Sequence, residues 1–219
     1  ETLYEYDIYS NLRKLTTENG DIIEYIVDGL NRRIAKIKNA KRVIGWIYKD
    51  QLNPVVEVRF DTNEAVSSVT HLFYAETPHS PSYLVRDGVE YKVISDHLGS
   101  VRVIINAQTG QIVQQANYSS FGETTFKSGD FISLGFAGGL TDEDSDLIRF
   151  GARDYDPQTG RWTTKDPIRF DGGDLNIYRY VNNDPVNLID PEGTRPLNPY
   201  ELSVLKILLV GVTVYLTYR

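Results

Sequence analysis

The sequence predicts a mostly β fold, and three observations lead to that prediction. Tyr is abundant, with 15 residues against 8 Phe and 2 Trp, and its shape suits the pleated, half-buried surface of a strand. Turn dipeptides separate short runs of alternating polarity along the first half of the chain. The second half contains the dipeptides Asp156-Pro157, Asp166-Pro167, Asp184-Pro185 and Asp190-Pro191. Because each Pro fixes its own φ and favours an extended conformation in the preceding Asp, this half must form short extended segments joined by tight turns.

The composition excludes several classes of function. The formal net charge is −7, whereas a nucleic-acid groove needs a basic stripe, so we expect no nucleic-acid partner. The chain has no Cys, which excludes disulfides, a thiolate metal site and a Cys nucleophile. It also has no Met and starts at Glu1, from which we expect a piece of a longer polypeptide or a processed product.

The first forty residues contain an internal repeat of strand, turn and strand. The Tyr-x-x-Asp pattern of residues 4–7 returns at residues 25–28, and a weaker copy starts at Trp46. Asp and Asn tolerate turn conformations and bond to their own backbone, and Asn19-Gly20 is a strong two-residue hairpin signal. We therefore predict a series of β-hairpins over residues 1–76, although a generic β-meander would give a similar pattern.

Further strands are expected on both sides of the loop at residues 77–81, whose prolines mark the best candidate for a boundary within the chain. Residues 56–61 alternate strictly between apolar and polar side chains, which predicts a strand with one dry and one wet face. The other predicted strands cover residues 71–74, 83–86, 90–94, 101–106 and 111–118.

Several longer motifs resemble the YD-repeat family, which includes Rhs and teneurin-like proteins. Residues 96–102 read DHLGSVR and resemble the family's DHLGS segment, and residues 121–123 resemble its FGE motif. From Gly135 to Gly193 the chain resembles the Rhs-associated core nearly motif for motif. The resemblance covers residues 1–193, and a match of that length is far more specific than any single motif.

The resemblance implies a fold and a role that spacing alone would not give. Family repeats are β-hairpins that wind into a large spiral shell, and the Rhs-associated core, here residues 83–193, turns inward and closes one end. In many members the shell encloses a C-terminal toxin. The resemblance thus implies a structural, encapsulating module of a bacterial or archaeal protein that is secreted or lies at the cell surface. Its implied partners are the remaining repeats, or copies of itself paired through strand edges, and a toxin or secretion-system component.

The resemblance also implies an alternative, enzymatic role. Some family members cleave off their own C-terminal segment by an aspartyl-protease reaction, and the pattern of that reaction falls here on Arg153, Asp166 and Asp190. The cut would follow Gly193, near Thr194-Arg195. Two carboxylates that share one proton can act as base and acid in peptide hydrolysis, and a nearby Arg can orient one of them.

A purely structural interpretation fits the same three residues. Asp-Pro is a favoured turn start, and Arg153 could pair with any of the nearby acids. The sequence departs from the self-cleaving members at Thr194, where they carry Leu, and at Arg169, where they carry Gly. The sequence by itself leaves both interpretations standing.

No metal or cofactor is predicted. The acidic run at residues 142–146 lacks the central Gly and the terminal Glu of a Ca²⁺ loop. His71, His79 and His97 lack the spacing of a zinc site. Residues 95–97 place Ser, Asp and His next to one another in sequence, whereas a catalytic triad converges in space.

The tail, residues 194–219, extends beyond the resemblance. Asn198 and Pro199 are typical of a helix start, and residues 202–216 are mostly apolar. We expect a short apolar C-terminal helix that packs on the shell. The apolar run is shorter than the roughly 20 residues of a spanning helix, but it also fits a membrane anchor, a self-association segment or a strand. A membrane anchor would make the protein a surface or adhesion protein, which is the third functional alternative.

Overall fold

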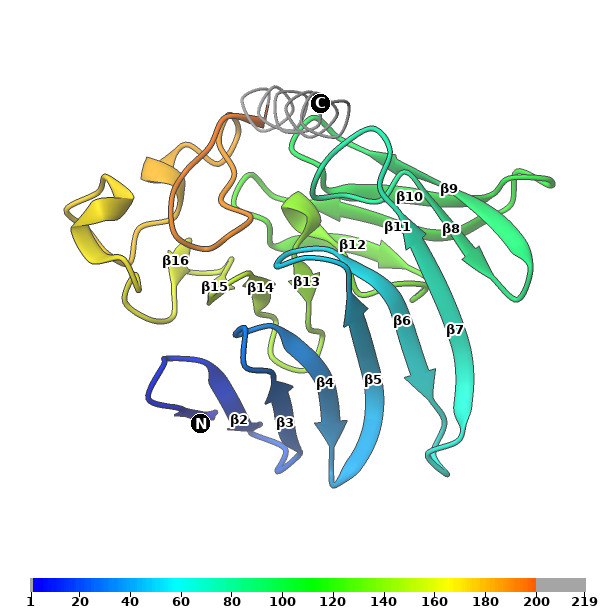
Figure 1. The fold of residues 1–219 in the computed structure, drawn as a ribbon, viewed down its shortest axis with the longest axis horizontal. Helices are drawn as coiled ribbons and strands as arrows, with labels where there is room; N and C mark the ends of the chain where they lie inside the picture. Colours follow the sequence, from blue (N-terminus) through cyan, green and yellow to red (C-terminus); the bar gives the residue numbers. More distant parts are fainter. Residues whose placement is uncertain (1, 200–219) are drawn as a thin grey trace, which may run out of the picture.

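The computed structural model describes residues 2–199, and this part of the chain is mostly β, as predicted (Figure 1). Twelve strands form one antiparallel sheet in which each strand pairs with the next along the chain. They are β1 (Leu3–Tyr6), β2 (Leu12–Thr16), β3 (Ile22–Val27), β4 (Arg33–Lys38), β5 (Lys41–Tyr48), β6 (Pro54–Phe60), β7 (Val66–Phe73), β8 (Tyr83–Arg86), β9 (Val89–Ser95), β10 (Val101–Asn106), β11 (Ile112–Tyr118) and β12 (Thr124–Ser128). A second antiparallel sheet contains β13 (Leu140–Thr141), β14 (Ile148–Phe150), β15 (Arg153–Asp156) and β16 (Arg161–Trp162).

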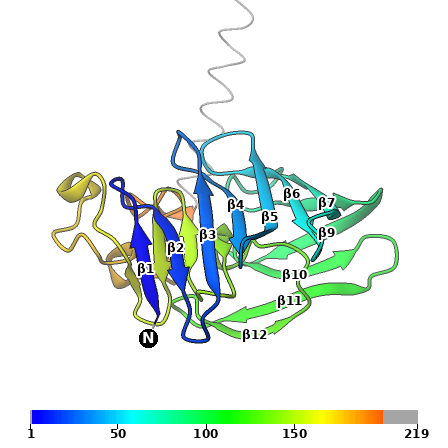
Figure 2. The same cartoon turned by 90° about the horizontal axis from the view of Figure 1, so that it is seen from below.

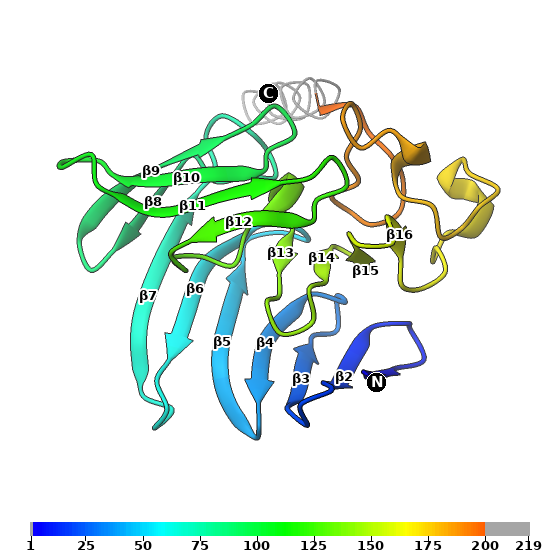
Figure 3. The same cartoon turned by 180° about the vertical axis from the view of Figure 1, so that it is seen from behind.

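The large sheet is curved, and the small sheet lies in its hollow. Figure 1 shows β2–β7 as one curved wall, with β8–β12 folded over one end of it. The small sheet lies between these two parts when the molecule is seen from the front and from behind (Figures 1 and 3). Seen from below, β1–β5 stand side by side, and β10–β12 run across the other side of the hollow (Figure 2). Hydrogen bonds join the layers: Val101 N donates to Gly135 O at 3.1 Å, and Tyr155 Oη donates to Phe121 O at 2.7 Å.

The turns of the repeats share one pattern of hydrogen bonds to an Asp carboxylate. The Asp7 carboxylate accepts hydrogen bonds from the backbone N–H groups two and four residues later, those of Tyr9 at 2.9 Å and Asn11 at 3.0 Å. The same pair of bonds recurs in the turns that start at Asp28, Asp61 and Asp96. An Asp in this position satisfies backbone donors that a tight turn leaves free, which explains the Asp of the repeated pattern.

Successive turns also contact one another at nearly the spacing of the sequence repeat. Asn11 Nδ2 donates to Asn31 Oδ1 at 3.2 Å, and Arg32 Nη1 donates to Asp50 O at 3.1 Å. Each repeat therefore stacks on the next through its turn as well as through its strands.

Three apolar clusters of described residues lie between the large sheet and the segments in its hollow, and the smallest of them joins Leu12, Leu15, Ile23 and Tyr25 to Leu147. The first lies between the large sheet and the segment that follows β12; its buried members are Trp46, Leu72, Leu84, Val93, Val101, Ile104, Phe131, Ile132, Leu134 and Leu140. The second contains stacked and edge-on aromatic rings of the small sheet and the loops around it. In this second cluster the ring centroids of Tyr155 and Tyr180 are 4.2 Å apart, and Trp162 meets Phe150 edge-on at 6.0 Å. Such pairs each contribute roughly 0.5–1.5 kcal/mol beyond the burial of their area.

The predicted strands are present, with some differences at their ends. The strands expected at residues 56–61, 83–86, 90–94, 101–106 and 111–118 correspond to β6, β8, β9, β10 and β11. β7 begins at Val66 and not at His71. The prediction missed its first residues because Ser67 and Ser68 lack the apolar signal of a strand, although Val66 and Ser68 pair with β6. β12 was not predicted, and its sequence, TTFKS, is mostly polar and exposed.

The proposed loop boundary at residues 77–81 does not interrupt the sheet, since β7 pairs with β8 across it. The division into residues 1–76, 83–193 and 194–219 stays a prediction. The predicted C-terminal helix and the apolar run at 202–216 lie outside the described residues. Among residues 2–199, no helix is long and apolar enough to cross a membrane.

Candidate functional site

The structure brings Arg153, Asp166 and Asp190 together, although they lie in three separate segments. Arg153 Nη2 is 2.8 Å from Asp166 Oδ2 and 3.4 Å from Asp190 Oδ2. All three side chains are buried. One guanidinium thus lies between two carboxyl groups and can neutralise only one of them.

Local structure fixes each of the three side chains. Arg153 begins β15, and its guanidinium lies 4.1 Å from the centre of the Trp162 ring, so the aromatic cluster supports it. Asp166 Oδ1 accepts a hydrogen bond from Ile168 N at 2.9 Å in the turn of its Asp-Pro dipeptide. Asp190 starts the turn that Gly193 closes, with Gly193 N donating to Asp190 O at 3.2 Å.

The peptide at the expected cut directly contacts this group. Arg153 Nε donates to Gly193 O at 2.5 Å, and Thr194 N donates to Asp190 Oδ1 at 2.9 Å. Gly193 has φ +67°, and a Cβ there would lie 2.5 Å from Phe150 O, so this position requires glycine. Ile189 and Leu197 then pair through two backbone hydrogen bonds of 3.0 and 2.7 Å, which close the loop. Arg195, the last residue of the expected cleavage segment, is exposed.

Burial changes the protonation of both carboxyl groups. Burial raises the pKa of Asp190 to about 6, although hydrogen bonds from the Thr194 backbone and the Arg153 charge act in the opposite direction. Burial also raises the pKa of Asp166 above its usual value, again against the Arg153 charge. Desolvation lowers the pKa of Arg153 itself. A carboxyl pair beside a single cation can therefore share one proton at a pH above the ordinary carboxyl range.

Asp142, His97 and His79, which the sequence analysis considered, are engaged in structural contacts. Asp142 binds Lys36 Nζ at 2.7 Å, the His97 ring contacts Val186 O at 2.8 Å, and the His79 ring contacts Leu98 O at 2.9 Å. Within residues 2–199, no cluster of His, Asp and Glu has the arrangement of a metal site.

The sequence reasoning missed a second buried charge cluster beside this site. Asp154 accepts hydrogen bonds from Arg33 Nη2 at 2.8 Å and from Arg149 Nη1 at 2.9 Å. Arg149 Nη2 also donates to Asn11 Oδ1 at 2.8 Å, and Arg33 lies 3.6 Å from the centre of the Tyr25 ring. The only sequence signal was the Arg and Asp content of the repeats and of β14–β15, which does not specify the pairing.

A third cluster joins β3 and β4 to the loop after β13. Tyr25 Oη donates to Asp142 Oδ2 at 2.8 Å, and Lys36 Nζ also lies 2.5 Å from Asp144 Oδ2. Lys38 Nζ contacts the same Asp144 at 2.6 Å. The two lysines and the two aspartates border a cavity of about 400 Å³. The acids and bases that line the cavity pair with one another, so it indicates no particular ligand.

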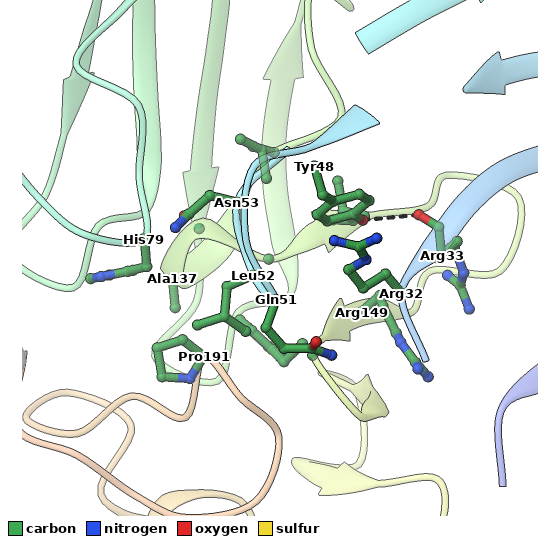
Figure 4. A pocket seen from close by; sticks show the side chains of 16 residues that line it. Arg32, Arg33, Tyr48, Gln51, Leu52, Asn53, His79, Ala137, Arg149 and Pro191 are labelled. Carbon is green, nitrogen blue, oxygen red and sulfur yellow. Dashed lines mark hydrogen bonds between the residues drawn. The ribbon is translucent and has the colours of Figure 1, made fainter. Parts of the chain in front are cut away.

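A small pocket marks where a repeat turn meets the core. Figure 4 shows Gln51, Leu52 and Asn53 of the turn between β5 and β6 on the same pocket as Ala137 and Pro191. Its volume is about 30 Å³, which is room for water and not for an organic substrate.

The curved sheet with a second sheet in its hollow defines a β-shell fold, and the sequence comparison gives the family. The family model described as "Teneurin YD-shell" matches residues 1–186, so this chain belongs to the teneurin YD-shell family. The chain is 32% identical over 195 residues to Teneurin-3 of Danio rerio and 33% identical over 231 residues to Salivary gland surface protein 1 of Aedes aegypti. The alignments cover 85% and 88% of this chain but 7% of each relative.

Solved structures share the fold at lower sequence identity. A crystal structure of TcdB2-TccC3-TEV matches with a TM-score of 0.68 and 22% identity, over 88% of this chain and 10% of that chain. A Tc holotoxin pore of Photorhabdus luminescens matches with a TM-score of 0.67 and 21% identity, over 90% of this chain and 10% of that chain. The chain therefore spans a small part of the proteins that it resembles.

Proposed function

We propose that this chain is a structural module of an encapsulating β-shell, in which the repeat strands form the wall and the segment after β12 forms a plug. We call residues 130–197 the core plug. The observation that carries the proposal is the set of buried ion pairs between wall and plug, above all Arg33 with Asp154 and Lys36 with Asp142. A buried charge is costly without its partner. The wall residues are therefore matched to a plug that occupies the hollow.

A larger shell would need more wall than this chain supplies. β1 and β12 are the edge strands of the described sheet, and all four residues of β1 are exposed. An exposed strand edge pairs readily with another strand. In a complete protein, further repeats would pair with such an edge, and in isolation a second copy of this chain would do so.

The names of the related proteins support a toxin-like or secretion partner for this chain and a location at the cell surface or outside the cell. The matched solved structures are Tc toxin assemblies, and one sequence relative is named a surface protein. By analogy, the shell of this protein would enclose a toxin-like segment or contact a secretion component, at the cell surface or after secretion. The membrane-anchored alternative depends on residues 202–216, and it stays a prediction from the sequence.

Mass photometry of the 219-residue chain tests the edge proposal. Association that grows with concentration is expected, and Leu3→Lys on the exposed edge strand should weaken it, since a charge disfavours edge pairing. Ile26→Lys on the interior strand β3 is the matched control, because Ile26 is also partly exposed but its strand already has two neighbours. A chain that stays monomeric at every concentration would rule out edge pairing between copies.

A second candidate function is self-cleavage after Gly193, and one contact favours it. Arg153 Nε donates to the carbonyl oxygen of Gly193, the group whose polarisation would assist attack on this peptide. The leaving nitrogen, Thr194 N, already faces the Asp190 carboxyl group. In this scheme Asp166 is the base, Asp190 is the acid, and Arg153 stabilises the oxyanion.

Intact mass before and after incubation tests the second candidate. Water addition between Gly193 and Thr194 would split the 219-residue chain into two fragments whose masses identify the cut. Asp166→Asn and Asp190→Asn should abolish cleavage, because each removes one partner of the acid–base pair. A chain that keeps its mass at every pH from about 4 to 8, a range that spans the ordinary and raised carboxyl pKa values, would exclude this function.

A further inference from the structure

The buried cluster that joins wall and plug contains more positive than negative charge. Arg33 and Arg149 are 2% and 4% exposed, and both guanidinium groups donate to the one carboxylate of Asp154. That carboxylate can neutralise only one of them. A buried charge is costly unless it is paired, so an additional negative charge beside the two arginines would stabilise the folded chain.

The neighbouring charged groups do not supply that negative charge. In the cluster after β13, two lysines and two aspartates balance one another. Arg32, next to Arg33 in the sequence, pairs with Asp28. The group of Arg153 and its two aspartates has one carboxyl group in excess, but within residues 2–199 no ion pair joins it to Arg33 or Arg149. The excess positive charge therefore stays with these two arginines.

Each of the two arginines also has a buried N–H group without an acceptor. The Nε atoms of Arg33 and Arg149 have no hydrogen-bond partner among the described residues. Both guanidinium groups are held in place, since Arg149 Nη2 donates to Asn11 Oδ1 at 2.8 Å and Arg33 lies 3.6 Å from the centre of the Tyr25 ring. Buried donors in folded proteins nearly always have an acceptor, so these two Nε–H groups indicate a ligand that accepts hydrogen bonds.

Both arginines line the small pocket of Figure 4. Among the described residues of its lining, three are arginines and none is Asp or Glu. Its volume of about 30 Å³ is above the roughly 10–15 Å³ that one water molecule needs, so a monatomic ion fits and an organic ligand does not. The exposed Gln51 also lines the pocket, which gives an ion access from solvent.

The protonation of the lining side chains agrees with an anionic ligand. Burial lowers the pKa of Arg149, and the charge of Arg33 adds to this effect against the attraction of Asp154. That direction is expected for a cation with too little negative charge around it. Burial also lowers the pKa of His79, whose Nε2 donates to Leu98 O at 2.9 Å. In this neutral ring Nδ1 is an acceptor, so the donors for an anion come from the arginines.

We propose that this pocket binds one monovalent anion, chloride in ordinary solution, on the Nε–H groups of Arg33 and Arg149. A single negative charge matches the single excess positive charge, and a charge-assisted hydrogen bond satisfies each Nε–H group. Arg33 belongs to strand β4 of the wall and Arg149 to strand β14 of the plug. The bound ion thus adds a link between wall and plug, and the stability of the folded chain depends on chloride.

A crystal of the wild-type chain in bromide tests the position of the ion, because bromide replaces chloride and gives an anomalous signal. We expect one anomalous peak within hydrogen-bonding distance of the Nε atoms of Arg33 and Arg149. A structure with water at this position, or without an anomalous peak there, would overturn the proposal.

Urea unfolding in chloride and in gluconate, at one ionic strength, tests the effect of the ion on stability. Gluconate is an organic anion that is too large for the pocket, and a constant ionic strength keeps charge screening equal. Because a ligand that binds only the folded chain stabilises it, the unfolding midpoint should rise as chloride replaces gluconate and should level off as the site fills. Equal midpoints in the two salts would refute a bound chloride.

Two substitutions that each remove one positive charge separate this site from general salt effects. Arg149→Gln removes the excess charge and one of the Nε–H groups, so the chloride-dependent rise of the midpoint should be lost. Arg161→Gln is the matched control, because it removes the same charge from an exposed side chain, and it should keep the full rise. A rise of wild-type size in Arg149→Gln would contradict the site. If Arg149→Gln does not fold, the two measurements on the wild-type chain decide the proposal.

Discussion

Aspartates in the repeat turns and in the core plug find their hydrogen-bond partners differently, the first within their own turn and the second in distant parts of the chain. Asp28 accepts hydrogen bonds from Leu30 N and Arg32 N at 2.9 and 3.0 Å, within its own turn. Asp154 in the plug is buried and relies on Arg33, which lies 121 residues earlier in the chain. The aspartates of the repeat turns are therefore satisfied locally, whereas Asp154 depends on contacts that only the folded shell provides. Substitutions in the plug should consequently cost more than equivalent ones in the turns.

The largest effect is expected at Asp154. Asp154→Ala would leave Arg33 and Arg149 buried without their shared carboxylate, and breaking such a pair costs about 3–5 kcal/mol. Urea unfolding measures the loss. Glu76→Ala removes the exposed pair with Lys92 and should cost less than about 1 kcal/mol. Equal losses in the two variants would contradict the contrast between plug and surface.

A pH-dependent effect of similar size is expected at Asp190. Its pKa in the folded chain, about 6, is above its usual 3.8, so folding takes up a proton between these values. The contribution of Asp190 to stability is then fully present below about pH 4 and is lost as the pH rises through about 6. Two pKa units correspond to roughly 3 kcal/mol. The free energy of unfolding, measured by urea titration across this pH range, should fall more steeply with pH for the wild type than for Asp190→Asn. Equal slopes for the two proteins would contradict a raised pKa of Asp190 in the folded chain.

Two buried tyrosines allow a hydrogen-bonded hydroxyl group to be compared with an unpaired one. Tyr25 Oη donates to the Asp142 carboxylate at 2.8 Å, and losing a hydrogen bond to a charged group costs about 1.5–3 kcal/mol. The Tyr180 hydroxyl is buried without a hydrogen-bond partner among the described residues. Tyr25→Phe should therefore lower the free energy of unfolding, while Tyr180→Phe should be neutral or slightly stabilising. A loss at Tyr180 as large as that at Tyr25 would show that its hydroxyl has a partner.

A smaller loss than at Asp154 or Asp190 is expected in a repeat turn. Asp28→Ala removes the hydrogen bonds from two backbone N–H groups and the partly exposed ion pair with Arg32. These groups can turn to water, so we expect a loss of about 1 kcal/mol. The melting temperature should fall by only a few degrees, and hydrogen exchange should quicken in that hairpin alone. Exchange that also quickened in β14 and β15 would show that the turn is not locally self-sufficient.

The wall was predictable from the sequence because its signals are local. Alternating polarity and turn residues predicted β6 and β8–β11 closely, whereas β7 begins at Val66 and not at the predicted His71. β12 escaped prediction because a mostly polar edge strand carries no such signal. The family resemblance supplied the inward-turning core, which periodicity could not.

The candidate site was predictable only in part. The resemblance selected Arg153, Asp166 and Asp190, and the structure shows that they meet. The role of Asp154 could not be predicted, because it depends on Arg33, a partner that only tertiary folding brings near. The charge content of a sequence does not show which charged residues pair in the folded chain.

Native-state hydrogen exchange tests most directly whether wall and plug form one unit. The slowest amides of β3–β5 and of β14–β15 should exchange through one common opening with the same free energy, and Asp154→Ala should lower both free energies together. Two results together would contradict the claim that wall and plug form one unit. The free energy of opening in the wild type would be several kcal/mol lower for β14–β15 than for β3–β5, and Asp154→Ala would leave the value for β3–β5 unchanged.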